Sequence, residues 1–189
     1  MRTIKLNVKT KTKNYPIYFG DNILNSTGKL IKKNLPQVKK ISIICDNKLP
    51  KNLSTKLVRS LKSYEVSLFK LSANEKNKSL TVANKIIQKL LKKNFNRSDC
   101  LIAFGGGVLG DLSAFISSLT KRGIKFINIP TTLLAQVDAS IGGKTGINSD
   151  QGKNLIGTFY QPDFIISDPI VLKSLPQREI VSGYAEILK

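Results

Sequence analysis

The sequence contains no histidine and no tryptophan, one methionine and only two cysteines. The absence of histidine removes the commonest metal ligand of proteins. Cys45 and Cys100 lie in separate apolar runs, which favours reduced, structural thiols over a disulfide or a reactive thiol. Stretches free of charge, such as residues 126–137, are shorter than the roughly 18 apolar residues of a membrane span. The first ten residues lack the apolar core of a signal peptide, so we expect a cytoplasmic protein with no membrane segment.

Acidic residues are also scarce: 12 Asp and Glu stand against 31 Lys and Arg, which gives a formal net charge of +19. Such an excess raises nucleic acid as a partner, because clustered cations neutralise phosphates. The lysines are scattered over nearly every predicted helix and turn, without interleaved aromatic residues or a recognisable reading motif. We therefore expect a solvated lysine-rich surface and no specific nucleic-acid partner. Weak nonspecific binding at low salt is compatible with this charge.

The apolar pattern alternates between strands and helices along the chain. An opening β-hairpin is indicated by the alternation of Ile4, Leu6 and Val8, followed by a second strand over residues 15–19. A helix capped by Asp21 and closed by Pro36 follows. Later strands are predicted over residues 41–45, 66–71, 100–104, 124–129 and 164–167, and helices over 53–61, 80–91 and 109–119. A last helix has apolar residues at positions 180, 184, 187 and 188 and Pro176 in its first turn. This alternation predicts an α/β fold with a mostly parallel sheet covered by helices on both faces.

Three consecutive glycines, residues 105–107, join a predicted buried strand to a predicted helix. Backbone N–H groups at such a turn can approach a diphosphate closely, and the helix N-terminus adds roughly half a positive charge. A strand-to-helix turn without a ligand is the structural alternative. Asp46 and the pair Thr131 and Thr132 also follow predicted strands. We therefore expect three strands to present polar groups to one crevice, where such sheets bind ligands.

A second glycine-rich region consists of QVDASIGGKTGIN, residues 136–148, and GKNLIGTFYQP, residues 152–162. Each glycine would destabilise a structural helix by about 1 kcal/mol, so we interpret this region as a loop built for close ligand approach. Lys144 and Lys153 suit phosphate or carboxylate groups, and Asn154 can both donate and accept hydrogen bonds. For any one of these lysines, a solvated surface charge is the simpler alternative.

The segments GGGVLGD, Arg122-Gly123, IPTTLLAQVDASIGGKTGIN, GKNLIGTFYQP and SGYAEILK, in this order, closely resemble 3-dehydroquinate synthase. The resemblance runs from Asp46 onward and is densest between Leu101 and Lys189. It departs from the family at NEKNK, residues 74–78, where glycine usually precedes the glutamate; Asn74 also tolerates a positive φ. The resemblance implies a Rossmann-like NAD-binding domain over residues 1–175. Residues 176–189 would be the first helix of a helical domain that binds metal and substrate.

The resemblance also implies roles for particular residues. Those that would contact NAD are Asp46, Glu75, Lys78, Gly106, Gly107, Val108, Asp111, Thr131, Thr132, Lys144, Lys153, Val171, Leu172, Lys173 and Ser174. Those associated with a phosphorylated sugar-acid substrate are Arg122, Asp138, Lys144, Asn154 and Lys189. Glu186 matches one ligand of a divalent metal, zinc or cobalt, whose other two ligands in the family are histidines. Because this sequence has none, we expect Glu186 and Lys189 to form a solvated ion pair here.

The implied activity is the NAD-dependent, redox-neutral conversion of 3-deoxy-D-arabino-heptulosonate 7-phosphate to 3-dehydroquinate and phosphate, in the shikimate route to aromatic amino acids. A catalytic zinc generally needs three protein ligands. We therefore expect the chain to be the first part of a longer enzyme and to be inactive by itself. The resemblance implies that the full-length enzyme is a homodimer. A related sugar-phosphate cyclase, a glycerol or iron-type alcohol dehydrogenase and a basic nucleic-acid-binding module remain as alternatives.

Overall fold

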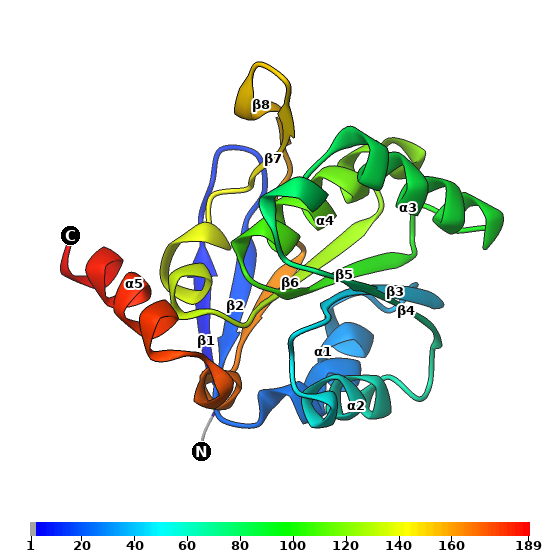
Figure 1. Ribbon diagram of the computed structural model, residues 1–189. Helices are drawn as coiled ribbons and strands as arrows, with labels where there is room; N and C mark the ends of the chain where they lie inside the picture. The colour runs from blue at the N-terminus through cyan, green and yellow to red at the C-terminus, as the bar shows by residue number, and fades with distance from the viewer. Residues whose placement is uncertain (1–2) are drawn as a thin grey trace.

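The computed structural model describes residues 3–189 of the chain. Its main sheet has seven strands in the order β1-β2-β9-β6-β5-β3-β4 (Figure 1). These strands are β1 (Ile4–Val8), β2 (Tyr15–Phe19), β3 (Lys40–Asp46), β4 (Glu65–Leu71), β5 (Cys100–Gly105), β6 (Lys125–Pro130) and β9 (Phe164–Ser167). Strand β1 runs antiparallel to β2, and the other neighbouring pairs of this sheet are parallel. The predicted mostly parallel sheet with an opening hairpin is confirmed.

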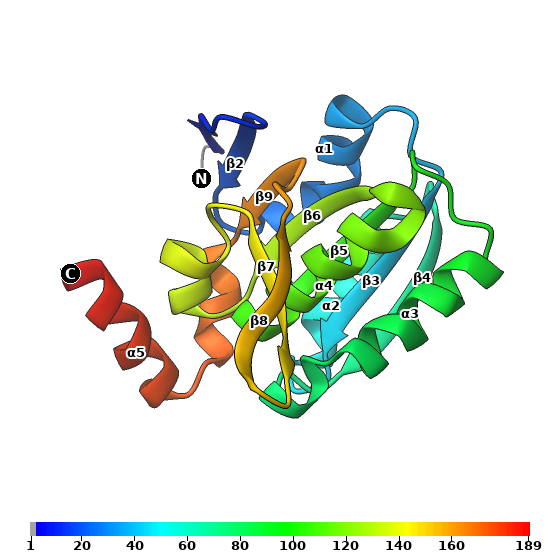
Figure 2. The same ribbon diagram turned by 90° about the horizontal axis from the view of Figure 1, so that it is seen from above.

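Helices cover both faces of the main sheet (Figures 1 and 2). On one face lie α1 (Thr27–Asn34) and α2 (Lys51–Ser60), and on the other lie α3 (Leu80–Lys92) and α4 (Gly107–Leu119). Successive strand residues face opposite sides, so Ile43 is buried in the cluster with α1 and α2 and Ile44 in the cluster with α3 and α4. Burial on both faces explains the continuous apolar runs of the central strands.

Two local predictions about helix starts were wrong. The first helical segment is divided into a 3₁₀ turn, η1 (Ile23–Ser26), and α1, which begins after Ser26. Asp21 does not cap either of them, because Asn22, with φ of 56°, precedes η1. The last helix, α5 (Gln177–Leu188), has Pro176 as its N-cap residue and not in its first turn. Both differences shift an element boundary by a few residues and leave the layer order unchanged.

The largest difference from the sequence prediction lies in residues 136–162. Instead of an irregular loop, the chain forms a short π-helical turn, η4 (Ala135–Ala139), and an antiparallel hairpin of β7 (Lys144–Ser149) and β8 (Gly152–Phe159). A Cβ atom on Gly157 would lie 2.1 Å from the carbonyl oxygen of Thr145, so the two strands approach as closely as they do because glycine is there. The hairpin runs beside α4 (Figure 2), where Ile147 is fully buried in the same cluster as Leu112.

Helix α5 lies at one end of the molecule, next to η4 (Figure 1). Gly183 is buried, and a Cβ atom on it would lie 2.6 Å from the Leu133 side chain and 2.7 Å from the backbone nitrogen of Leu134. The helix also exposes the apolar residues Val181, Tyr184, Ile187 and Leu188. A close backbone contact at Gly183 therefore fixes α5 in place, while much of its apolar surface stays uncovered.

Cys45 and Cys100 are free and buried, as the sequence predicts. In the part of the chain that the structure describes, every helix is too short or too polar to cross a bilayer.

Candidate functional site

The carboxyl ends of three neighbouring parallel strands meet at one edge of the sheet. Strand β3 ends at Asp46, β5 at Gly105 and β6 at Pro130, and the last residues of β5 and β6 are register partners. The backbone nitrogen of Thr131 donates to the carbonyl oxygen of Gly105 at 3.0 Å, and a carboxylate oxygen of Asp46 accepts from the backbone of Lys48 at 3.0 Å. The polar groups predicted to share a crevice do lie at this common edge.

The N-terminus of α4 is at the same edge, directly after β5. Gly106 is its N-cap residue and makes no side-chain capping bond, and the first turn holds no acidic side chain. The first N–H groups of any helix lack partners within the helix, so those of Gly107 and Val108 remain available to a ligand. Together with the helix dipole they form a donor set that fits an anionic group such as a diphosphate.

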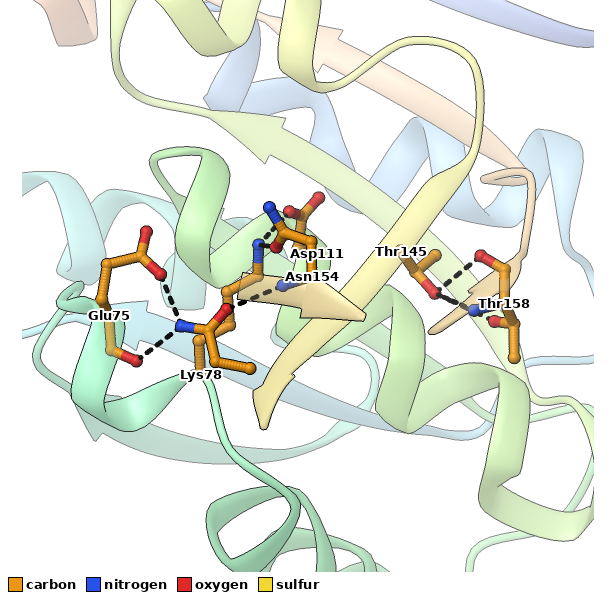
Figure 3. Close-up of polar contacts among 7 residues, drawn as sticks. Glu75, Lys78, Asp111, Thr145, Asn154 and Thr158 are labelled. Carbon is orange, nitrogen blue, oxygen red and sulfur yellow. Dashed lines mark hydrogen bonds and ion pairs between the residues drawn. The ribbon is translucent and has the colours of Figure 1, made fainter. Parts of the chain in front are cut away.

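Lys78 connects this helix to the β7–β8 hairpin (Figure 3). Its side chain is only 4% exposed. Its Nζ atom lies 2.5 Å from Oδ2 of Asp111 on α4 and 2.5 Å from Oδ1 of Asn154 on β8. The carbonyl oxygen of Lys78 accepts from the backbone nitrogen of Asn148 on β7 at 2.7 Å. One buried lysine thus holds together the segment after β4, the start of α4 and both hairpin strands.

Asn148 completes this cluster, although no pattern within QVDASIGGKTGIN distinguishes it from its neighbours. Its Nδ2 atom donates to Oε2 of Glu75 at 2.7 Å, and its Oδ1 atom accepts from the backbone nitrogen of Asn154 at 3.1 Å. Glu75 lies in the 3₁₀ turn η2 (Glu75–Asn77), which Asn74 caps by accepting from the backbone of Asn77. Asn74 has φ of −129°, so the turn forms without the positive φ that glycine would supply.

Burial raises the pKa of the Asp111 carboxyl above its ordinary value. The hydrogen bond and charge of Lys78 act in the opposite direction, and the negative charge of Glu75 adds to the rise. The net rise means that desolvation of Asp111 outweighs its ion pair. Without Lys78, the carboxylate would be harder still to keep ionised.

An open cavity of about 430 Å³ lies between Asp111 and the hairpin. It is lined by Asp111, Lys144, Thr145, Gly146, Asn154, Gly157, Thr158 and Phe159. The hydroxyl of Thr145 donates to the carbonyl oxygen of Thr158 at 3.0 Å (Figure 3). The Thr158 hydroxyl donates to that of Ser118 on α4 at 3.0 Å. These bonds fix the wall of a cavity that brings a cation, a carboxylate and an amide together.

Other residues expected to bind substrate are not brought to this cavity. Arg122 lies in η3 (Thr120–Arg122) and lines a different cavity, at the amino ends of β5 and β6, together with Arg97 and Lys125. Asp138 is exposed on η4 and is not part of the lining. The same holds for Lys153, which is expected to contact NAD and is exposed beside Asn154. Within this chain, Lys144 and Asn154 are therefore the expected substrate residues that share a cavity.

The remaining expected cofactor residues lie in two groups. Thr131 is buried, and Thr132 packs so closely against the glycine turn that a Cβ atom on Gly106 would lie 3.1 Å from its Cγ2 atom. The 3₁₀ turn η5 (Pro169–Ser174) contains the expected residues 171–174. Val171 is buried in the hydrophobic core and Leu172 is partly buried against it, whereas Lys173 and Ser174 are exposed.

Glu186 on α5 is the expected metal ligand. The structure places its Oε1 atom 3.5 Å from Nζ of Lys189, the ion pair that the sequence predicts. Among residues 3–189, no three His, Cys, Asp or Glu side chains gather closely enough to hold a metal ion. A catalytic zinc site needs three protein ligands, so the described residues do not fit such a site.

The parallel sheet, its helices on both faces and the glycine turn at its carboxyl edge define a Rossmann-like α/β domain. Residues 68–182 match the family described as 3-dehydroquinate synthase N-terminal. The chain therefore belongs to the 3-dehydroquinate synthase family.

Individual relatives agree with this assignment. A 3-dehydroquinate synthase from Pelagibacter ubique is 53% identical over 189 residues, which cover all of this chain and 51% of that protein. The solved structure of 2-deoxy-scyllo-inosose synthase with carbaglucose-6-phosphate, NAD+ and Co2+ has a TM-score of 0.91 at 25% identity, over 98% of this chain and 50% of that one. A 2-epi-5-epi-valiolone synthase from Streptomyces hygroscopicus with NAD+ and Zn2+ has a TM-score of 0.83 at 28% identity, over 96% and 50%. The chain spans about half the length of the curated relatives it matches.

Proposed function

We propose that this chain forms the NAD-binding part of a 3-dehydroquinate synthase. The observation that carries the proposal is the uncapped N-terminus of α4, which lies at the carboxyl edge of the sheet. The same helix carries Asp111, which lines the cavity. Membership of the family and the NAD+ of the two related synthase structures support the choice of this dinucleotide. Residues 1–175 would form the NAD-binding domain, and residues 176–189 would begin a second one.

The groups at this edge suit the parts of a dinucleotide. The backbone N–H groups of Gly107 and Val108 would donate to the diphosphate, and the Asp46 carboxylate would accept from a ribose hydroxyl. Thr131 and Thr132 border the same turn. Bound there, NAD would supply reversible oxidation of a substrate hydroxyl.

The cavity beside Asp111 suits the phosphorylated sugar acid. Lys144 would hold an anionic group as a point charge, and Asn154 would orient the substrate by hydrogen bonds. The complete conversion of 3-deoxy-D-arabino-heptulosonate 7-phosphate to 3-dehydroquinate and phosphate is proposed for an enzyme of the relatives' full length. We propose that this enzyme is a cytoplasmic homodimer whose metal ligands include Glu186 and residues other than those described.

The substitution Val108→Glu tests the cofactor site. Val108 is partly exposed in the first turn of α4, where a carboxylate favours the helix but repels a diphosphate. We expect calorimetric titration to give at least about tenfold weaker NAD binding for Val108→Glu, a loss of about 1.4 kcal/mol, with an undiminished melting temperature. Val108→Gln, which adds no charge, is the matched control. Equal NAD affinity in the two variants would contradict a diphosphate site at this helix.

A turnover assay tests the expected dependence on further residues. With NAD, zinc and the heptulosonate phosphate, we expect the 189-residue chain to release no phosphate above the rate without protein. The physical reason is that residues 3–189 assemble no three-ligand metal group. Protein-dependent phosphate release would show that this chain is sufficient for catalysis.

A further inference from the structure

The hydrogen bonds of Lys78 determine which atoms of Asn154 a ligand can reach. A lysine ammonium group only donates hydrogen bonds, so the atom of Asn154 that faces it has to be the acceptor, Oδ1. The distance from Lys78 Nζ to this oxygen is 2.5 Å. The amino group, Nδ2, is consequently turned away from Lys78. Asn154 is exposed and lines the open cavity, so a ligand in the cavity would meet hydrogen-bond donors at this residue.

Neighbouring contacts keep this orientation in place. The backbone of Asn154 has φ of 60° and is held by the bond from its nitrogen to Oδ1 of Asn148. Asn148 is fixed in turn by its bond to Glu75. Lys78 is almost fully buried, so its ammonium group would lose a partner without gaining water if the Asn154 amide rotated. Rotation of the amide would also direct two N–H donors at a cation.

The ammonium group of Lys78 also binds one carboxylate oxygen of Asp111, another polar residue that lines the cavity. Its Nζ atom lies 2.5 Å from Oδ2 of Asp111. Lys78 is therefore bonded to both Asp111 and Asn154, while Lys144 lines the same cavity and is exposed to a ligand. Across the cavity the donors of Asn154 and the positive charge of Lys144 are both complementary to acceptor oxygens.

We infer that Lys78 is a positioning residue that fixes Asn154 as a hydrogen-bond donor, so that the cavity beside Asn154 and Lys144 selects an oxyanion of the ligand. Lys78 acts through Asn154 and does not itself have to touch the ligand. The identification of the oxyanion with a group of the sugar-phosphate substrate rests on the proposed function. The orientation of the amide does not, because it follows from the donor chemistry of Lys78.

The first experiment compares Asn154→Asp with Asn154→Ala in the 189-residue chain, using inorganic phosphate as the probe. In the Asp variant, one carboxylate oxygen can still accept from Lys78, and the other replaces the donor that faces the cavity. We expect phosphate, followed by the NMR shifts of the Gly146 and Gly157 amides, to bind at least tenfold more weakly to Asn154→Asp than to the parent chain. It should also bind more weakly to Asn154→Asp than to Asn154→Ala.

Gln151→Glu is the matched control for charge, because Gln151 is exposed on the same hairpin and lies outside the cavity lining. It should change phosphate affinity less than Asn154→Asp does. The inference is overturned if phosphate fails to shift the cavity amides of the parent chain. It is also overturned if the Asp variant binds phosphate as well as the Ala variant.

The second experiment addresses Lys78 itself. In the parent chain we expect the Asn154 side-chain amide to show NMR contacts of one fixed orientation, and in Lys78→Met to show averaging between two. Lys76→Met removes the same charge from an exposed position in η2 and should leave the amide fixed. A fixed amide in a folded Lys78→Met chain would contradict the positioning role. If Lys78→Met does not fold, the comparison of Asn154→Asp with Asn154→Ala still tests whether Asn154 presents a hydrogen-bond donor to the ligand.

Failure of the proposed NAD site and failure of the positioning role of Lys78 would appear in different measurements. Loss of the predicted difference between Val108→Glu and Val108→Gln would remove support for the NAD site. It would leave the phosphate and amide measurements, which contain no NAD, unchanged.

Discussion

Cys45 illustrates how the surroundings of one side chain make stability depend on pH. Burial raises the pKa of its thiol from 9.0 to about 11, with a smaller upward contribution from the charge of Asp46 and an opposing one from Lys70. Burial likewise raises the pKa of Cys100 well above 9.0. The folded chain therefore retains thiol protons that the unfolded chain loses.

We expect stability to fall at alkaline pH for this reason. The thiol contribution is fully present below pH 9.0, the unfolded pKa, and is lost as pH rises through about 11, the folded pKa of Cys45. Urea unfolding at pH 9 and pH 11 should give a lower midpoint at pH 11. In Cys45→Ala the drop should be smaller, although the variant starts from lower stability because of the cavity it creates. An equal drop in both chains would contradict a role for this thiol.

Single residues are also where prediction from sequence reaches its limit. The resemblance identified Lys78, Asp111 and Asn154 as functional positions. It could not reveal that they contact one another, because Lys78 is 33 residues from Asp111 and 76 residues from Asn154. Only the packing of η2, α4 and the hairpin brings the three together. The burial of Lys78 could not be predicted from the sequence either, because an isolated lysine usually indicates a solvated charge.

At the level of elements, α5 depends on one close contact. Replacing Gly183 by valine would place a branched side chain where even a Cβ atom is 2.6 Å from Leu133 and 2.7 Å from the backbone of Leu134. We expect Gly183→Val to detach α5, so that amide exchange over residues 177–188 becomes at least tenfold faster while the amides of β5 are unchanged.

Ser182→Val is the control for this substitution. It introduces the same side chain at the neighbouring, exposed position of α5, where nothing has to move. Equal exchange rates in the two variants would mean that the contact at Gly183 does not hold the helix.

The accuracy of the element predictions follows the physical origin of each pattern. Residues 80–91 and 41–45 were predicted within one or two residues of α3 and β3, because their apolar residues face a large core directly. The β7–β8 hairpin was missed because its glycines and polar residues carry no regular alternation. It is stabilised by contacts to the rest of the fold, through the burial of Ile147 and the bonds of Thr158 to Thr145 and Ser118.

For the whole molecule, the net charge of +19 is the dominant electrostatic property. Like charges over a compact surface repel one another and destabilise the folded state, and salt screens this repulsion within about 8 Å at physiological ionic strength. We expect the melting temperature, measured by circular dichroism, to rise by several degrees between low and physiological concentrations of sodium chloride. A melting temperature that falls with added salt would mean that attractive ion pairs, such as the one between Lys13 and Asp163, outweigh the repulsion.

Strand β9 has a consequence for how the chain is made. It lies between β2 and β6, and the nearby bond from the backbone of Asn22 to Asp168 spans 146 residues. During synthesis the opening hairpin leaves the ribosome well before β9, its neighbour in the sheet. Until residues 164–167 emerge, β2 and β6 each carry an unpaired edge, the kind of surface through which nascent chains aggregate. The four residues of β9 therefore determine when a growing chain can cover these two edges and stop exposing them to other nascent chains.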